Sequence, residues 1–376
     1  MRLGPATSAS LCSAAFFALG VLTAVLTSSS IALVQAAKRL LRMKANTPPH
    51  AETDMRNKTV IVTGANTGIG LQVAKKLAEK GATVVMACRN IQKAERSAKI
   101  IRDQDMTGTL VPMQCDLADL EEVAAFAENF SANFDTLDAI VCNAGVPVGL
   151  SQPTAQGFEQ AFGVSLVAHY LLVRLLLPLL CKSSHRRVVF LGSVTHWFSQ
   201  PAVTASWDCA AYDRYSIFQR LVLGNDSYSD AKGACILLAL ALRSRDVMAA
   251  VADPGAARTD IWRYLPDFLR LPLDILMRRF FLSPEQAATS VVHGVTSASM
   301  RGIYFSNYYS LKYFPHMQVV GSFAGARAAT CKPMLTGGGR AELARHAEKL
   351  WVWAETKIAS VCPHIASLVA PVPRTG

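Results

Sequence analysis

Tyr228 and Lys232 are the two residues whose types and spacing best suit proton transfer. They stand four positions apart in a stretch that reads as a helix, so their side chains share one face, one turn apart. A cationic lysine beside a tyrosine stabilises the phenolate and lowers the pKa of the phenol from about 10 toward neutral pH. Helices also carry such pairs by chance, so the pair indicates acid–base chemistry only together with other motifs.

A glycine-rich turn in TVIVTGANTGIG, residues 59–70, predicts a phosphate site. The β-branched residues at 59–63 favour a buried strand, and LQVAKKLAEKG after the turn reads as a helix. Gly64, Gly68 and Gly70 let the backbone approach a ligand, and the helix N-terminus directs N–H groups and a positive dipole toward an anion. The spacing is G-x-x-x-G-x-G rather than G-x-G-x-x-G, and a glycine turn alone can serve chain shape only.

Arg89 indicates which dinucleotide such a turn would hold. It stands just past a second apolar strand at 82–87, where dinucleotide-binding folds place the group that contacts the adenosine ribose. An acidic residue there binds the 2′-hydroxyl of NAD, whereas an arginine pairs with a 2′-phosphate. Arg89 therefore favours NADP(H) as the cofactor. The alternative is that Arg89 is simply a surface arginine at the end of a strand.

Strand-like and helix-like segments alternate along most of the chain. The expected strands are 59–63, 82–87, 109–115, 137–142, 187–191, 247–252 and 302–305. The expected helices are 71–81, 91–104, 119–132, 154–181, 225–243 and 284–296, with one more at 341–356. Alternation with apolar, uninterrupted strands is typical of a parallel sheet covered on both faces. We predict a single α/β domain, a Rossmann-type doubly wound parallel sheet with helices on both faces.

Ser193 is a third polar candidate, because it comes just past the expected strand at 187–191. Parallel strands end at one edge of such a sheet. Ser193 and Tyr228 could therefore both face a bound nicotinamide.

At this point the chain resembles the short-chain dehydrogenase/reductase family over about residues 57–308. The matching motifs are TGANTGIG for the family's TGxxxGxG turn, Cys142-Asn143-Ala144-Gly145 for NNAG, Tyr228-Ser229-Asp230-Ala231-Lys232 for YxxxK, and Asp253-Pro254-Gly255 with Thr259 for PG…T. Three further features are similar to the retinol-dehydrogenase-like branch of the family, namely Cys88-Arg89-Asn90, Ser193 followed by His196, and SPEQAATS at 283–290. Members of that branch have an N-terminal anchor and prefer NADP.

The resemblance implies a role for each matching residue. Ser193 would hydrogen-bond the substrate oxygen, Tyr228 would exchange a proton with it, and Lys232 would lower the pKa of Tyr228. The implied cofactor-binding residues are Gly64, Thr67, Gly68, Ile69 and Gly70 at the pyrophosphate, Arg89 at the 2′-phosphate, Asp116 and Leu117 at the adenine, Asn143, Ala144 and Gly145 at the adjoining ribose, and Tyr228, Lys232, Pro254, Gly255 and Thr259 at the nicotinamide end. No residue is assigned to a metal.

Plainer interpretations exist for three of these positions. Asp116 could be a helix cap, Asn143 a turn residue, and His196 a residue on a loop surface, which is the interpretation we prefer for His196. One departure affects the proton relay. Ser165 stands where the family usually has an asparagine that helps to hold a water chain to the active-site lysine, and the shorter serine would need another water.

The N-terminal segment predicts a membrane anchor. Residues 3–37 carry no charge, and the apolar core 11–37 exceeds the roughly 20 residues that span a bilayer. Basic residues follow within 38–44, so the positive-inside rule places the domain on the cytoplasmic side, at the endoplasmic reticulum or another organelle. Val34-Gln35-Ala36 resembles a cleavage site, so a removed signal peptide or an organellar transit peptide is the alternative. We divide the chain into anchor and basic flank (1–44), linker (45–57), NADP-binding domain (58–308) and C-terminal extension (309–376).

The charge distribution and the cysteine and histidine patterns argue against a nucleic-acid partner, a disulfide framework and a metal site. The net charge of +11 comes from 38 Lys+Arg against 27 Asp+Glu, but outside 38–44 the basic residues are scattered, without the aromatic interleaving of nucleic-acid binders. Nine cysteines without a C-x-x-C pair suit a reducing compartment, and eight histidines show no metal-ligand spacing.

The leading prediction is an NADP(H)-dependent oxidoreductase of lipid metabolism that interconverts a carbonyl and an alcohol on a lipophilic substrate. Retinoid-, steroid- and polyprenoid-like molecules all fit. The aromatic-rich stretch 197–218 could line an apolar entrance, and the basic amphipathic stretch 261–282 could be a lid on the membrane; both could also simply pack on the domain. Two alternatives stay open: reduction of a carbon–carbon double bond, and an NADP-binding scaffold or sensor without turnover. A homodimer is also left open.

Overall fold

The computed structural model describes residues 53–102, 106–146, 153–193, 195–196, 199, 227–255, 257–258, 281–298, 303–306 and 340–369. The predicted anchor at 1–44, nearly all of the aromatic-rich stretch 197–218 and most of the stretch 261–282 lie outside these ranges. Thr259 also lies outside them. The predictions made for these segments stay predictions.

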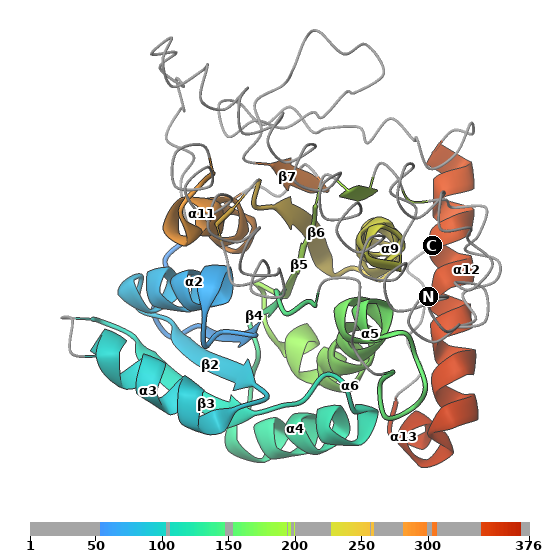
Figure 1. Ribbon diagram of the computed structural model, residues 1–376, viewed down its shortest axis with the longest axis horizontal. Coiled ribbons are helices and arrows are strands. Elements are labelled where there is room, and N and C mark those ends of the chain that lie inside the picture. The colour runs from blue at the N-terminus through green and yellow to red at the C-terminus, as the bar shows by residue number, and fades with distance from the viewer. Residues whose placement is uncertain are drawn as a thin grey trace, which may run out of the picture.

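One parallel sheet of seven strands forms the centre of the molecule, in the order β3-β2-β1-β4-β5-β6-β7 (Figure 1). The strands are β1 (Thr59–Thr63), β2 (Thr83–Cys88), β3 (Thr109–Gln114), β4 (Ala139–Cys142), β5 (Arg187–Leu191), β6 (Met248–Asp253) and β7 (Tyr304–Ser306). The chain starts at the middle of the sheet, moves outward to β3, returns to β4 and then moves outward the other way. This arrangement confirms the predicted doubly wound parallel sheet.

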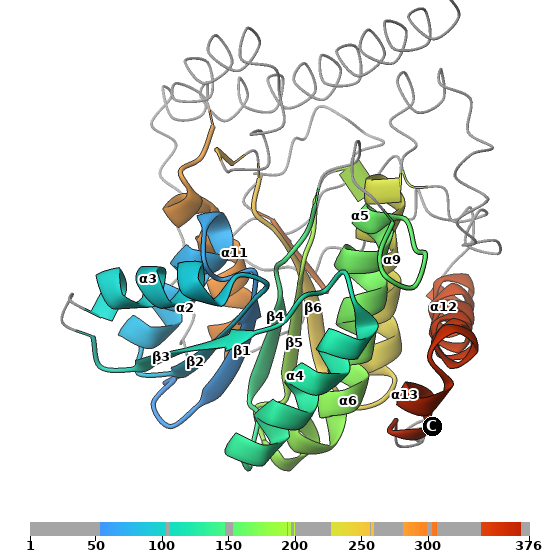
Figure 2. The same ribbon diagram turned by 60° about the horizontal axis from the view of Figure 1, so that its bottom comes forward.

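Helices cover both faces of the sheet (Figure 2). They are α2 (Gly68–Glu79), α3 (Ile91–Arg102), α4 (Leu120–Asn133), α5 (Gln160–Phe162), the π-helix η1 (Gly163–Val167), α6 (Ala168–Lys182), α9 (Ser227–Arg243), α11 (Pro284–Thr296), α12 (Arg340–Val361) and α13 (Pro363–Ser367). Alternate residues of β1 serve the two faces. Val60 and Val62 pack in the core under α2, α3 and α11, whereas Ile61 packs in the core under α4, α6 and α9.

The long apolar helix predicted at 154–181 begins later, so that boundary was wrong. Residues 154–157 form a turn, in which the Thr154 hydroxyl accepts from the Phe158 amide at 3.0 Å and Gly157 has a φ of +78°. The carboxylate of Glu159 then accepts from the amide of Phe162 and caps the helix, which widens into the π-helix η1 before α6. Residues 154–159 read TAQGFE, so the glycine at 157 and the acidic cap at 159 were the available signs of a later start.

Among the described residues, one helix, Gln160–Lys182, is long and apolar enough to cross a membrane. Most of it is buried inside the domain, and α6 packs against α4 and the sheet. Such burial is typical of a core helix.

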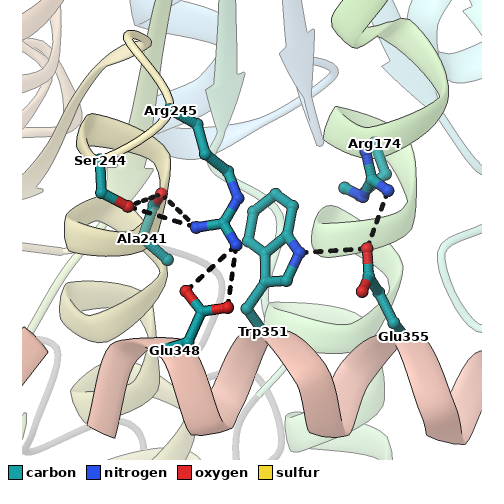
Figure 3. A network of polar contacts seen from close by, with 7 residues as sticks. All are labelled: Arg174, Ala241, Ser244, Arg245, Glu348, Trp351 and Glu355. Carbon is teal, nitrogen blue, oxygen red and sulfur yellow. Dashed lines mark hydrogen bonds and ion pairs between the residues drawn. The ribbon is translucent and has the colours of Figure 1, made fainter. Parts of the chain in front are cut away.

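The C-terminal helix α12 packs against the outer side of α6 and α9 (Figure 1). Its Trp351 lies between two arginines, with ring-to-Cζ distances of 5.0 Å to Arg174 and 4.0 Å to Arg245 (Figure 3). Glu355 accepts from Arg174 at 2.8 Å, and both oxygens of Glu348 accept from Arg245 at 3.1 Å. Both guanidinium groups are buried and paired, so ion pairs join α12 to α6 and to the turn after α9, in addition to its apolar packing.

Candidate active site at the carboxyl edge of the sheet

The predicted site residues follow the carboxyl ends of neighbouring strands. In strand order they are Gly64 after β1, Arg89 after β2, Asp116 after β3, Asn143 after β4, Ser193 after β5 and Pro254 after β6. Because the strands are parallel, all of these residues lie along one edge of the sheet, on both sides of the point where the strand order reverses.

The glycine turn after β1 packs directly on the turn after β4. Gly64 has a φ of +63°, a conformation that favours glycine. A Cβ on Gly70 would lie 2.4 Å from Nδ2 of Asn143 and 2.4 Å from the carbonyl oxygen of Gly64. The close approach of the two turns therefore explains why residues 64 and 70 are glycines.

Thr63 joins these two turns, although the sequence indicated no site role for it. Its hydroxyl accepts from the backbone amides of Asn143 and Ala144, each at 2.9 Å, and Nδ2 of Asn143 donates to the carbonyl of Thr63 at 2.8 Å. Asn143 is thus a satisfied turn residue that also fixes the shape of the cradle. A polar residue at the end of a fully buried strand was the available sign of this role.

His169 extends the connection to the helix that carries Ser165. Its Nδ1 lies 3.0 Å from the carbonyl oxygen of Ser165, and its Nε2 lies 2.9 Å from the hydroxyl of Thr63. Because a carbonyl only accepts, Nδ1 carries the proton and Nε2 accepts from Thr63. Burial lowers the pKa of His169 to about 4, so the ring is neutral at physiological pH.

The N-terminus of α2 suits an anion. Thr67 is its N-cap residue, and its first turn, which includes Gly68 and Ile69, carries no acidic residue. Arg89 is exposed beyond the buried end of β2. The N-terminus of α2, with glycines that leave no space for a side chain in the turn, fits the pyrophosphate of a nicotinamide dinucleotide.

The predicted adenine residues follow β3. Leu117 is buried, and the carboxylate of Asp116 accepts from the amide of Ala118 at 3.0 Å. The N-cap of α4 is Asp119, the first residue of the helix predicted at 119–132, since its carboxylate accepts from the amide of Glu121 at 3.0 Å. Asp116 therefore shapes the turn and is not the cap.

Lys232 lies beside Tyr228 as their spacing predicted. Its Nζ is 5.3 Å from the centroid of the Tyr228 ring, and it donates to the carbonyl of Leu191, the last residue of β5, at 2.7 Å. The side chain is buried, and this loss of solvent lowers the pKa of Lys232. The pair therefore lies next to the strand end that carries Ser193.

Ser165 reaches the same place from the opposite helix. A Cβ on Gly145 would lie 3.3 Å from Oγ of Ser165 and 3.8 Å from Nζ of Lys232. Oγ of Ser165 is buried and has no hydrogen-bond partner among the described residues, while its carbonyl accepts from Sγ of Cys235 at 3.7 Å as well as from His169. The turn after β4, η1 and α9 therefore meet at Lys232.

The turn after β5 carries Ser193 and a buried histidine, His196. Oγ of Ser193 accepts from the amide of Thr195 at 3.2 Å, which leaves the hydroxyl proton for another acceptor. His196, which we interpreted as a loop surface residue, is buried, and its Nδ1 lies 2.6 Å from the carbonyl oxygen of Ser193. That interpretation was wrong because Tyr304 of β7, far along the sequence, covers the turn.

The last described part of the edge is the turn after β6. Pro254 is buried, and Gly255 has a φ of +81°. The amide of Gly255 donates to the carboxylate of Asp253 at 2.9 Å. This bond fixes the start of the segment in which Thr259 was predicted to contact the nicotinamide.

Comparison with known proteins agrees with this arrangement. The profile of the family described as short chain dehydrogenase matches residues 58–206. Retinol dehydrogenase 12 of Mus musculus is 33% identical over 299 residues, which cover 78% of this chain and 84% of the relative. Polyprenol dehydrogenase of Mus musculus is 31% identical over 296 residues, 76% of this chain and 85% of the relative.

A solved structure shows the same fold. The crystal structure of an uncharacterized protein from Mycobacterium Paratuberculosis superimposes with a TM-score of 0.55 at 25% identity, covering 81% of this chain and 95% of that chain. The resemblance to the retinol-dehydrogenase-like branch is confirmed by the curated relatives. The chain therefore belongs to the short-chain dehydrogenase/reductase family of oxidoreductases.

Proposed function

We propose that this protein interconverts a carbonyl and an alcohol on a lipophilic substrate, with NADP(H) as cofactor and Tyr228 as the acid–base group. The observation that carries the proposal is the placement of Lys232, buried beside the Tyr228 ring and bonded to the end of β5. The names of the relatives, retinol and polyprenol dehydrogenases, support a lipophilic alcohol as substrate.

The cofactor residues are assigned from the cradle. Gly64, Thr67, Gly68, Ile69 and Gly70 would hold the pyrophosphate, Arg89 the 2′-phosphate, Asp116 and Leu117 the adenine, Asn143, Ala144 and Gly145 the ribose, and Tyr228, Lys232, Pro254, Gly255 and Thr259 the nicotinamide end. When bound, the cofactor supplies a hydride to a carbonyl carbon or accepts one from an alcohol carbon.

The protein's own groups would handle the oxygen and its proton. The hydroxyl of Ser193 donates a hydrogen bond to the substrate oxygen, which polarises it. Tyr228 gives that oxygen its proton during reduction and takes it back during oxidation. Lys232 stabilises the resulting phenolate, because its positive charge lies beside the ring in a dry site.

A substitution at Tyr228 tests this assignment. Detergent-solubilised full-length protein is mixed with NADPH and a panel of retinoid, steroid and polyprenoid aldehydes and ketones, and NADPH absorbance is followed. Tyr228→Phe keeps the ring and removes the proton, so we expect turnover to fall by about 10²–10⁴-fold while NADPH affinity, measured by fluorescence, stays within about twofold of wild type. If wild type and variant bind NADPH equally and neither consumes it, the non-catalytic scaffold is the better interpretation.

A second substitution tests the cofactor. Arg89→Asp should weaken NADPH binding far more than NADH binding, because the carboxylate repels the 2′-phosphate. Arg89→Lys is the matched control, since it keeps the charge and loses only the bidentate geometry. Equal weakening of both cofactors by Arg89→Asp would refute the 2′-phosphate assignment.

We also propose that residues 1–44 anchor the protein in a membrane with the domain on the cytoplasmic side. The support is the uncharged segment 3–37 followed by basic residues at 38–44. In sealed microsomes the domain should be cleaved by added protease without detergent. Full protection would refute this orientation and favour import into an organelle.

A further inference from the structure

We propose that His196, Tyr304 and Asp253 form a positioning network that holds the Ser193 turn in its reactive geometry. None of the three was expected to act in the site, and they come from the loop after β5, from β7 and from the end of β6. The proposal rests on the proposed function, in which Ser193 orients the substrate oxygen.

The near end of the network closes the Ser193 turn. The carbonyl of Ser193 accepts two bonds from His196, one from the backbone amide at 3.1 Å and one from Nδ1 at 2.6 Å. Between these residues, the amide of Thr195 donates to Oγ of Ser193 at 3.2 Å. The direction of the Ser193 hydroxyl is therefore set by a turn that the His196 ring helps to close.

The middle of the network supports this turn from below. The ring of Tyr304 lies 4.9 Å from the His196 ring, centroid to centroid, and its Oη is 3.3 Å from Nδ1. A Cβ on Gly192 would lie 3.4 Å from Cε2 of Tyr304 and 2.6 Å from Cγ1 of Val251. Tyr304 thus touches the chain on both sides of Ser193, at Gly192 and at His196.

The far end fixes Tyr304 itself. Its hydroxyl donates to one carboxylate oxygen of Asp253 at 2.8 Å, and the other oxygen accepts from the amide of Gly255 at 2.9 Å. The exposed fractions of His196, Tyr304 and Asp253 are 6%, 4% and 2%. The carboxylate of Asp253 is buried and accepts two hydrogen bonds, one of them from the Tyr304 hydroxyl. The Tyr304 ring therefore cannot rotate freely and forms a rigid support.

The direction of every hydrogen bond in the network is consistent. The Tyr304 proton is used toward Asp253, so its oxygen only accepts from His196. The carbonyl of Ser193 also only accepts, so Nδ1 of His196 carries the proton and serves both. One neutral tautomer of His196 therefore satisfies the network, whereas buried polar groups of mismatched direction would each cost stability.

A phenylalanine at 304 would fill the same space against Gly192 without burying a hydroxyl or needing a carboxylate. Burying the hydroxyl of Tyr304 and the carboxylate of Asp253 therefore costs more free energy than apolar packing at this place would. We infer that it is retained for orientation, because it ties three separate segments of the sheet edge to one peptide group.

A double-mutant cycle separates positioning from stability. Tyr304→Phe should lower kcat by about 10-fold with NADPH affinity within about twofold, because the hydride and phosphate sites are untouched while Ser193 is misplaced. In a Ser193→Ala background the same substitution should change kcat by less than about twofold. Equal losses in both backgrounds would show a general structural effect and overturn the proposal.

Two further variants sharpen the cycle. His196→Phe keeps the ring and removes the Nδ1 donor, whereas His196→Asn keeps a donor and should recover part of the lost kcat. Tyr170→Phe is the control for removing a buried phenol, because Tyr170 of α6 packs on Trp351 away from Ser193, and its kcat should match wild type.

A readout without turnover keeps the network testable if the proposed reaction is wrong. In hydrogen–deuterium exchange, the amides of the peptide that contains Ser193–His196 should exchange at least about fivefold faster in Tyr304→Phe and His196→Phe, because the bonds to the Ser193 carbonyl are weakened. The peptide of β1 should be unchanged. Unchanged exchange at 193–196 would overturn the positioning role, whereas failure of wild type to consume NADPH would refute only the proposed reaction.

Discussion

Thr63→Val is the substitution that most directly tests how the cofactor cradle is built. Valine has nearly the shape of threonine, so the buried end of β1 keeps its packing. What is lost is one hydroxyl that accepts from the amides of Asn143 and Ala144 and donates to Nε2 of His169. The effect therefore measures hydrogen bonding rather than a cavity.

The expected loss of stability in Thr63→Val depends on which of the three groups bonded to the Thr63 hydroxyl keep another hydrogen-bond partner. The amide of Asn143 also lies 3.0 Å from the carbonyl of Val141, so it retains one acceptor. The amide of Ala144 and Nε2 of His169 lose theirs, and each unsatisfied buried group costs about 1–3 kcal/mol. Since Ala144 is half-buried and can recover a water, we expect a loss of about 2–4 kcal/mol in the free energy of unfolding.

Urea unfolding followed by circular dichroism provides the measurement, with NADPH fluorescence as the functional readout. Thr63→Ser is the matched control, because it keeps the hydroxyl and should lose only about 1 kcal/mol for the methyl group. NADPH affinity should fall by roughly tenfold in Thr63→Val alone, because the turn after β4 loses its anchor. If the valine and serine variants are equally stable and bind NADPH equally, the Thr63 hydroxyl does not hold the two turns together.

Three other outcomes can be measured with the same protein. Gly70→Ala should weaken NADPH binding by more than about tenfold, because its Cβ would lie 2.4 Å from the carbonyl oxygen of Gly64 and 2.4 Å from Nδ2 of Asn143 in the facing turn. Leu71→Ala should bind NADPH normally, and equal affinity of the two variants would contradict the tight packing. Trp351→Leu should cost about 3 kcal/mol of stability in urea and expose α12 to protease, because both arginine–indole contacts are lost; an unchanged midpoint would show that they contribute nothing. Burial lowers the pKa of His169 and of His196 from 6.5 to about 4, so the stability that their neutral forms contribute is present above pH 6.5 and is lost as the pH falls through 4. Protonation of each histidine in the unfolded state should therefore lower the free energy of unfolding by about 2 kcal/mol between pH 7 and pH 5. In His169→Gln the free energy of unfolding, measured in urea, should depend less steeply on pH; a pH dependence equal to that of wild type would refute the contribution of His169.

The parts of the fold that sequence predicted well are those encoded by short, local patterns. Strands of apolar residues followed by glycine or a polar residue were enough to predict that Gly64, Asn143 and Ser193 lie at one edge of a parallel sheet. The spacing of Tyr228 and Lys232 predicted their shared face, because a helix has a fixed period. Such features depend on neighbours in sequence, so a single chain reveals them.

The missed features depend on contacts between distant segments. His196 is buried by Tyr304, which lies in a strand of only three residues, and no local pattern showed that this strand would cover the turn. The role of Trp351 requires one arginine from α6 and one from the turn after α9. At 154–159 the sequence TAQGFE did contain a glycine and an acidic cap, but the boundary depends on the bond from the Phe158 amide to Thr154, which decides where the chain turns.

Two buried histidines near the site make the same kind of hydrogen bond. His169 donates from Nδ1 to the carbonyl of Ser165, and His196 donates from Nδ1 to the carbonyl of Ser193. A carbonyl acceptor fixes one tautomer, and burial lowers the pKa of both rings to about 4. Both rings can therefore hold main-chain groups next to the site without adding a positive charge that would compete with Lys232.

Among the three groups that favour the charged form of Lys232, namely Cys235, Asp253 and Cys142, only Asp253 is ionised at neutral pH, because burial raises the pKa of Cys235 to about 11 and raises the pKa of Cys142 well above its usual value. Burial raises the pKa of this carboxyl to about 6, and the bonds from Gly255 and Tyr304 together with the charge of Lys232 oppose that rise. At neutral pH the carboxyl is ionised and favours the charged form of the buried lysine, which in turn favours the phenolate of Tyr228. The bond from Gly255 lowers the pKa of Asp253 more than the bond from Tyr304 does, so the position of Ser193 is the connection through which Tyr304 chiefly acts on the chemistry.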